Sequence, residues 1–272
     1  MVPVTFARHV PVVQALVDDR LESPFGFDTG AGLTLVRPEM LERLGHMLEG
    51  PVHVGQRMNG RELSVPLTHL ESLTIGSHRQ HHPPVGAYSI RGLTSRGRPL
   101  GGMVSLGFVE DVAATLDLAG GRLILEDDDT LRERSEGGTS VPVEVRRHGA
   151  QVEIFLTLEL PSGEEAKVEV DTGCDRLLLN ERLKDRLAVN RSKRGLTLRS
   201  VVGHLIRPKV SVAELQGSVA VVSAPHVAER NPEVAFTDLI YDGVMGCEFL
   251  RRYPITFDLR GGRIIFGPSV RT

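Results

Sequence analysis

The sequence has no tryptophan, only two cysteines and little net charge, and each shortage excludes a class of protein. A formal net charge of −3 gives no field that would attract nucleic acid or an anionic membrane surface. Two cysteines in 272 residues cannot form the disulfide framework of a small secreted scaffold. No run of about 18 apolar residues is present to span a bilayer. We therefore expect neither a nucleic-acid nor a membrane partner.

The N-terminus also lacks the basic segment and following apolar segment of a secretory signal. We therefore expect a cytoplasmic protein without a substantial propeptide. With 40% apolar and 25% charged residues, the composition is typical of a globular protein. The chain is long enough for one large domain or for two of about 130 residues.

The chain reads as β-rich, because short runs of Val, Ile, Leu and Thr alternate with Gly, Pro, Asn and Asp turns. Helical patterns are short, and the best of them cover 37–48 and 180–187. The polar stretch "EDDDTLRERSEGG" at 126–138 shows no clear period and is the natural linker. The predicted domains are a first lobe, a linker and a second lobe, at 1–126, 127–140 and 141–272.

Internal repetition is the strongest organisational feature of the sequence. Asp28-Thr29-Gly30 recurs as Asp171-Thr172-Gly173, and "TLDLAGGRLILE" at 115–126 recurs as "TFDLRGGRIIFG" at 256–267. A hairpin-type glycine follows each aspartate by the same interval, at Gly60 and Gly203. An apolar pair and a glycine come later, as Val244-Met245-Gly246 in the second half and as the segment ending at Gly107 in the first. The two halves are therefore predicted to be duplicates.

Each aspartate of the repeated triplet follows an alternating strand, "PFGF" or "AKVEV", whose apolar residues face one side. Asp28 and Asp171 would point to the other side, where Thr-Gly turns the chain. An isolated Asp-Thr-Gly is usually a plain turn. Two lobes related by a pseudo-two-fold axis would instead bring both turns to one interface. Carboxylates held there within about 3 Å share one proton and can activate a water while polarising a carbonyl.

A duplicated β lobe with one such triplet per copy resembles the aspartic proteases, and more narrowly two retropepsin-like lobes on one chain. The resemblance covers about residues 9–126 and 141–267 and is especially close in "GVMGCEFLRRYPITFDLRGGRIIF". It implies an all-β fold of two pseudo-symmetric retropepsin/pepsin-like β-barrel lobes with short helices and a cleft between them. It also implies that Thr29 and Thr172 brace the catalytic pair through their hydroxyls, while Gly30 and Gly173 permit close approach to the aspartates.

The residues that follow each triplet predict how the pair titrates. Pepsin-type enzymes usually have Ser or Thr there, whose hydroxyl stabilises the charged carboxylate. This chain has Ala31 and Cys174, so we expect the pair to work nearer neutral pH than in an acid protease. Cys174 is either a small core residue or a neighbour of Cys247 in a redox-sensitive bridge.

Two hairpins are candidate flaps over the pair, and "NG" at 59–60 is a strong signal for the first of them. Asp175 is expected to pair with Arg251 or Arg252, whereas the first lobe has Gly32 at the matching place. The predicted flap and cleft residues that contact substrate are Asn59, Gly60, Val202, Gly203, Ala31, Gly32, Cys174 and Asp175.

A histidine-rich run, "SHRQHHPPVG" at 77–86, invites a metal interpretation. Its spacing has no helical pair, and the following Pro-Pro indicates a loop, so we expect a loop and no metal site. The basic run at 191–195 is expected to be a solvated loop, because no aromatic residues accompany it. No cofactor is implied.

The predicted function is an aspartic endopeptidase acting on polypeptides, with Asp28 and Asp171 as the catalytic pair. One chain supplies both aspartates, so a monomer suffices, although further oligomerisation remains open. The alternative from another class is a catalytically idle peptide-binding module of the same fold. A third possibility is a peptidase with a single specific protein substrate.

Overall fold

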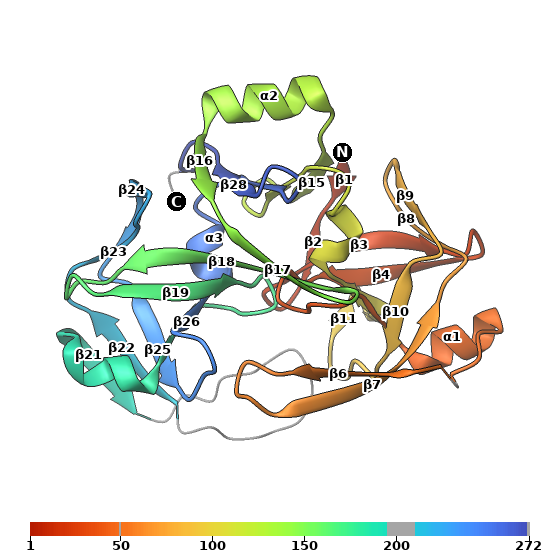
Figure 1. Ribbon diagram of the computed structural model, residues 1–272, viewed down its shortest axis with the longest axis horizontal. Coiled ribbons are helices and arrows are strands. Elements are labelled where there is room, and N and C mark those ends of the chain that lie inside the picture. The colour runs from red at the N-terminus through yellow and green to blue at the C-terminus, as the bar shows by residue number, and fades with distance from the viewer. Residues whose placement is uncertain (49, 195–209, 271–272) are drawn as a thin grey trace.

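The computed structural model describes residues 1–48, 50–194 and 210–270, and it consists mostly of β-strands. Two lobes lie side by side beneath a sheet that both of them share (Figure 1). The predicted all-β fold with two pseudo-symmetric lobes and few short helices is confirmed. No helix among the described residues is long and apolar enough to cross a membrane.

The first lobe is built on a strongly curled sheet, in which β2 (Thr5–Ala7) adds to the edge of β3. A separate ribbon of β11 (Thr94–Ser95) and β12 (Arg98–Pro99) lies beside it. In spatial order the strands of the sheet are β6 (Val52–Gln56), β7 (Glu62–His69), β10 (Pro84–Ala87), β5 (Leu35–Val36), β13 (Gly102–Val104), β4 (Leu21–Phe27), β3 (Val10–Val17), β8 (Ser72–Ile75) and β9 (His78–His81).

The second lobe repeats this order strand for strand, and β17 (Glu144–His148) adds to β18 as β2 adds to β3. The parallel pairs recur as well, because β26 lies parallel to β19 as β13 does to β4. Its strands are β21 (Val189–Arg194), β22 (Ser211–Leu215), β25 (Glu233–Thr237), β20 (Leu177–Asn180), β26 (Gly243–Met245), β19 (Glu165–Val170), β18 (Gln151–Glu159), β23 (Ser218–Val221) and β24 (Ala224–Arg230).

A six-stranded sheet joins the lobes, and its two central strands are the repeated segments that end each half. The hydroxyls of Thr115 and Thr256 meet there at 2.6 Å, where β14 pairs with β27. The order is β1 (Val2–Pro3), β15 (Arg122–Leu125), β14 (Ala114–Asp117), β27 (Ile255–Asp258), β28 (Arg263–Phe266) and β16 (Thr139–Pro142). Sequence repetition therefore becomes an approximate two-fold axis through this sheet.

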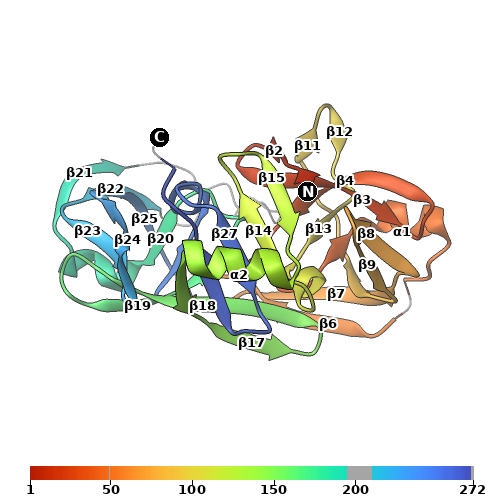
Figure 2. The ribbon, with the colours of Figure 1, turned by 90° about the horizontal axis from the view of Figure 1, so that it is seen from above.

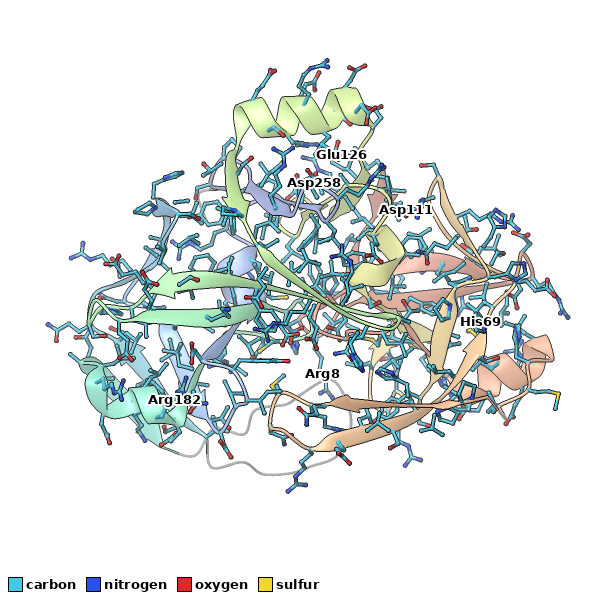
Figure 3. All side chains as sticks on the ribbon, viewed as in Figure 1. Arg8, His69, Asp111, Glu126, Arg182 and Asp258 are labelled. Atoms are coloured by element: carbon cyan, nitrogen blue, oxygen red, sulfur yellow. The ribbon has the colours of Figure 1, made fainter. Side chains whose placement is uncertain are left out.

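The predicted linker contains a helix, which the sequence pattern did not indicate. Helix α2 (Asp128–Gly137) lies over the shared sheet (Figures 1 and 2), and it buries none of its residues. Asp127 starts it with a reciprocal capping box to Thr130. Below it, Arg134 pairs with buried Glu126 at 2.9 Å, and Figure 3 shows Glu126 and Asp258 beneath the helix. A helix held by caps and ion pairs has no apolar stripe for a sequence reading to detect.

The other helices are shorter than predicted. Of 37–48, only α1 (Pro38–Leu44) is helical, because Gly45 adopts a left-handed conformation and ends it. The segment at 180–187 forms the 3-10 helix η2 (Glu181–Arg186). The remaining helices are η1 (Leu106–Val109) and α3 (Cys247–Leu250).

The core forms where both strands that precede the aspartates bury their apolar face. Phe25, Phe27, Val168 and Val170 are completely buried in one cluster that includes both lobes. The predicted apolar face of each strand thus packs into the core, and the opposite face is buried as well at this end of the strand, at Gly26 and Glu169. Each aspartate thus emerges from the end of a strand that core packing on the opposite face fixes in place.

Candidate active site

Each lobe delivers one aspartate from the end of a central strand. Asp28 follows β4, and its amide donates to Val104 O of β13 at 2.9 Å. Asp171 follows β19, and its amide donates to Met245 O of β26 at 3.0 Å. The apolar pair of the first lobe is thus Met103-Val104, followed by Ser105. The prediction of a segment ending at Gly107 is wrong, because Ser105 occupies the place that Gly246 has in the second lobe.

The two Asp-Thr-Gly turns interlock through their threonines, which are both fully buried. Thr29 Oγ1 donates to Val170 O at 2.7 Å, and Thr172 Oγ1 donates to Phe27 O at 2.6 Å. Each hydroxyl also accepts the other threonine's amide, at 3.0 and 3.1 Å. Both threonines therefore satisfy their polar groups across the lobe interface, and the contacts obey the approximate two-fold symmetry.

This interlock brings Asp28 and Asp171 together where the lobes meet. Their side chains hydrogen-bond to each other, and the two residues are only 3% and 5% exposed. Gly30 N donates to Asp28 Oδ1 at 3.1 Å, and Gly173 N donates to Asp171 Oδ1 at 2.6 Å. Each carboxyl group is thus held by its own turn and by the opposite carboxyl.

The triplet glycines also touch the opposite carboxyl group. A Cβ built on Gly30 would lie 2.5 Å from Asp171 Oδ1, and one built on Gly173 would lie 2.5 Å from Asp28 Oδ1. Real side chains do not approach that closely. Glycine is therefore required here to leave room for the partner carboxyl, and not only to form a turn.

Burial and repulsion shift the titration of this pair. Burial raises the pKa of Asp28 well above its usual range, and the charge of Asp171 raises it further. Burial also raises the pKa of Asp171, although the hydrogen bond from Asp28 opposes that shift. Two carboxyls in contact cannot both ionise without large cost, so the pair holds one shared proton to higher pH than a free aspartate would.

The residues after the triplets give the pair no hydroxyl. Ala31 has none, and Cys174 Sγ donates to Arg176 O at 3.3 Å. Cys174 and Cys247 are neighbours, because Cys247 N donates to Cys174 O at 2.9 Å. Both thiols are free and buried, and burial raises the pKa of each. Thiols that stay protonated are poor partners for disulfide exchange.

The structure corrects the partner predicted for Asp175. Its carboxylate pairs with Arg176 at 3.3 Å, and Arg176 also pairs with Glu233 at 2.6 Å. Arg252 pairs instead with Glu229 at 3.1 Å. A neighbouring guanidinium that already bridges two carboxylates makes a more distant arginine unnecessary.

Gly32, the first-lobe counterpart of Asp175, helps to join the lobes. Its carbonyl accepts Val152 N at 2.9 Å, and a Cβ at this position would lie 2.8 Å from Gln151 Cγ. The start of β18 in the second lobe therefore rests on the first Asp-Thr-Gly loop.

The first predicted flap is a hairpin formed by β6 and β7, which reaches from the first lobe toward the second (Figure 1). Asn59 Oδ1 accepts Arg61 N at 3.2 Å within its turn. At the tip, Met58 O accepts Ile240 N at 2.9 Å, and Gly60 lies against Ile240. The hairpin tip is thus tied to the opposite lobe. Val202 and Gly203, predicted for the second flap, lie outside the described residues.

The histidine-rich run is a strand in part and not a loop throughout. β9 (His78–His81) pairs with β8, and His78 Nε2 contacts Phe108 O at 3.0 Å. The strand pairs despite its polar side chains, because it lies at the edge of the sheet. In the described part of the chain, no three His, Cys, Asp or Glu side chains are grouped to hold a metal ion.

Sequence reasoning missed two residues beside the aspartates. His9, at the tip of the β2–β3 hairpin, contacts Gly173 O through Nε2 at 2.8 Å, and no local motif indicates this long-range contact. Glu169 is buried on β19, two positions before Asp171. Its signal was present, since a charged residue in "AKVEV" shares the face of the catalytic candidate.

Comparisons with known proteins agree with this architecture. Residues 13–107, which include the first triplet and its hairpin, match a family model described as aspartyl protease. Among solved structures, the chain is similar to basic 7S globulin from soybean, with a TM-score of 0.60 and 11% sequence identity over 98% of this chain and 94% of that one. This likeness shows the fold. A search of curated proteins found no match.

Proposed function

We propose that this chain, an aspartyl protease-like protein, is an aspartic endopeptidase that uses Asp28 and Asp171 to hydrolyse peptide bonds. The observation that carries the proposal is the meeting of two buried carboxyls, one from each lobe, across the threonine interlock. A plain turn aspartate needs neither an opposite carboxyl nor a glycine against that carboxyl.

The geometry supports a mechanism without a covalent intermediate. With one proton shared by the pair, the ionised carboxyl takes a proton from a water, and that water attacks the scissile carbonyl carbon. The protonated carboxyl donates a hydrogen bond to the carbonyl oxygen as negative charge develops there. The amine then leaves with a proton from the pair, which returns to its starting state.

The β6–β7 hairpin would act as the cover of this site. It contacts the second lobe at its tip, through Met58 and Gly60, and along β6, where His53 Nε2 lies 3.2 Å from Gln151 Oε1. Opening at these few contacts would admit an extended peptide. Such a peptide can hydrogen-bond along exposed strand edges with its own backbone. Closure over the bound peptide would then exclude water other than the nucleophile.

The proposal is tested by incubating a diverse peptide library with the full chain, from about pH 3.5 to about pH 7.5, and reading the products by mass spectrometry. The expected result is a defined set of cuts that the Asp28→Asn and Asp171→Asn variants do not make. Binding without cuts at any pH would favour the idle peptide-binding module. Cuts that survive in either variant would place the chemistry elsewhere. Cuts confined to one protein substrate would indicate a dedicated processing peptidase.

We expect the pH optimum of kcat/KM to lie nearer neutrality than that of an acid protease. The pKa values of both aspartates are raised by burial, so activity falls at low pH when both carboxyls are protonated, and at high pH when the shared proton leaves. Both limits move upward with these pKa values. An optimum below about pH 4 would contradict this expectation.

Ala31→Ser should move the acidic limit of the profile to lower pH, by about half a unit to one unit, because a hydroxyl that donates to the charged carboxylate stabilises it. The measurement is kcat/KM against pH for both proteins. Ala119→Ser, in an exposed turn, is the matched control and should leave the profile unchanged. An unchanged or upward-shifted acidic limit in Ala31→Ser would show that this position does not tune the pair.

A further inference from the structure

Glu169 is the one charged residue on the buried end of β19, and it lies beside the proposed catalytic pair. It is 4% exposed. Side chains two positions apart on a strand share a face, so Glu169 and Asp171 point the same way, opposite to buried Val168 and Val170. A glutamate has no packing reason to occupy this place in a strand.

The carboxyl group of Glu169 has no fixed partner. Within residues 1–48, 50–194 and 210–270, no hydrogen bond or ion pair satisfies it, and Arg146 is the cation whose charge reaches it. Arg146 is already paired with Glu144 at 2.6 Å. Unlike Glu126 Oε2, which is fully enclosed without a partner, neither Glu169 oxygen is completely enclosed. Glu169 is therefore a buried, unpaired carboxyl group with an opening toward solvent.

A second carboxylate lies on the same face. Phe155 pairs with Glu169 across β18 and β19, and continuing this register places Glu153 opposite Asp171. Gln151 Nε2 donates to Glu153 Oε1 and holds this side chain. The charges of Asp171, Glu153 and Asp28 all act on Glu169, and with burial they raise its pKa. The face thus carries several carboxyl groups, and the Arg146 guanidinium lies beside them.

Aromatic rings stand beside these carboxyls. Phe155 and Tyr241 pack edge to face with their centroids 4.8 Å apart, and both rings adjoin the face that Glu169 occupies. The Arg146 guanidinium already lies 4.2 Å from the Phe155 ring centroid, which shows that a cationic side chain is accommodated there. Rings can pack against the aliphatic stem of a long basic side chain whose charged end reaches a carboxylate.

The equivalent place in the first lobe has a different character. Gly26 takes the position of Glu169 there, and a Cβ on Gly26 would lie 2.6 Å from Met103 Sδ. Met103 belongs to an apolar cluster with Val10, Val12 and Leu35. The two sides of the catalytic pair therefore differ, with an acidic group on one side and a thioether over glycine on the other.

We propose that Glu169, supported by Glu153, forms a subsite that binds a lysine or arginine side chain of the polypeptide next to the scissile bond. This inference rests on the proposed function in placing the subsite next to the bond that is cut. Recognition of the basic side chain requires only that a peptide binds across the pair.

Binding and cleavage are measured separately, so that the two proposals can fail separately. The Asp28→Asn protein is used to select tight binders from a random peptide library, and the same selection is made with Asp28→Asn/Glu169→Gln. We expect lysine and arginine to be enriched at one position in the first selection and not in the second. Glu169→Leu in place of Gln should turn the preference toward apolar residues. Glu165→Gln, at the exposed start of the same strand, is the matched control and should keep the basic preference.

Wild-type cleavage completes the test. For a peptide that is cut, replacing the basic residue by norleucine should lower kcat/KM by at least about tenfold in wild type and have little effect in Glu169→Gln, because the charge pair is then already lost. Basic enrichment without any cleavage would support the subsite and reject the peptidase. The subsite would be overturned if peptides bind or are cut without a basic preference. It would also be overturned if the preference persists in Glu169→Gln and Glu169→Leu, or if no peptide binds.

Discussion

Asp28→Asn and Asp171→Asn, each made alone, are expected to reduce peptide cleavage by at least about 10³-fold. The pair acts as a unit, in which one carboxyl must accept a proton from water while the other donates a hydrogen bond to the substrate. Asparagine can donate a hydrogen bond but can neither take up nor release a proton, so with either substitution the pair can no longer hold one proton, take a second from water and return one to the leaving amine. For the same reason the double variant should be no less active than either single variant. Initial rates on one cleaved peptide, measured with all three variants, check this prediction.

The fold should survive these substitutions, which separates a chemical effect from unfolding. Burial raises the pKa of Asp28 in the folded protein, so the wild type loses stability as pH rises from the unfolded pKa of about 3.9 through the raised folded value. Asparagine carries no charge and loses nothing over that range. The Tm of Asp28→Asn at neutral pH should therefore equal or exceed that of the wild type, while the two converge at acidic pH. If either single variant still cleaves peptides at close to the wild-type rate, the aspartate that it retains acts as the base alone.

The duplicated architecture could be predicted because its evidence repeats along the chain. Two Asp-Thr-Gly triplets in register gave the lobes, and alternation in "PFGF" and "AKVEV" gave the buried faces of β4 and β19. The structure then places both triplets at one interface, with Thr29 and Thr172 each bonded to the other lobe. Repetition and strand alternation are local signals, whereas the bracing by the two threonines was predicted from the resemblance to aspartic proteases.

Other features of the structure could not be predicted from these sequence patterns. Helix α2 has caps and ion pairs but no apolar stripe, so its pattern resembled a linker. Asp175 pairs with Arg176 because that guanidinium is anchored by Glu233, a residue far along the chain. His9 reaches Gly173 only when the two lobes are joined. The pairing of Asp175 and the contact of His9 depend on tertiary placement, which composition and period do not encode, whereas the Asp127–Thr130 cap of α2 is a local signal.

Gly30→Ala and Gly173→Ala are expected to destabilise the fold and remove activity, although each adds only one methyl group. In both cases the new Cβ would lie 2.5 Å from a carboxyl oxygen of the opposite aspartate, so one group must move. Forcing an extra methyl into a packed site costs about 1–3 kcal/mol of unfolding free energy. A displacement of about 1 Å in a catalytic group can cost about 100-fold in rate. Denaturant unfolding and kcat/KM on the same preparations measure the two effects.

Comparison with Gly137→Ala isolates the cause. Gly137 ends α2, has no atom within 4 Å of a built Cβ, and should be replaced without loss of activity or stability. A stronger discriminator is Gly30→Ala combined with Asp171→Gly, which removes the opposing carboxyl. If the clash is the cause, the second substitution should restore the stability lost to Gly30→Ala while the protein stays inactive. If stability is not restored, the glycine is required by its own turn, and the close approach of the two lobes does not explain its presence.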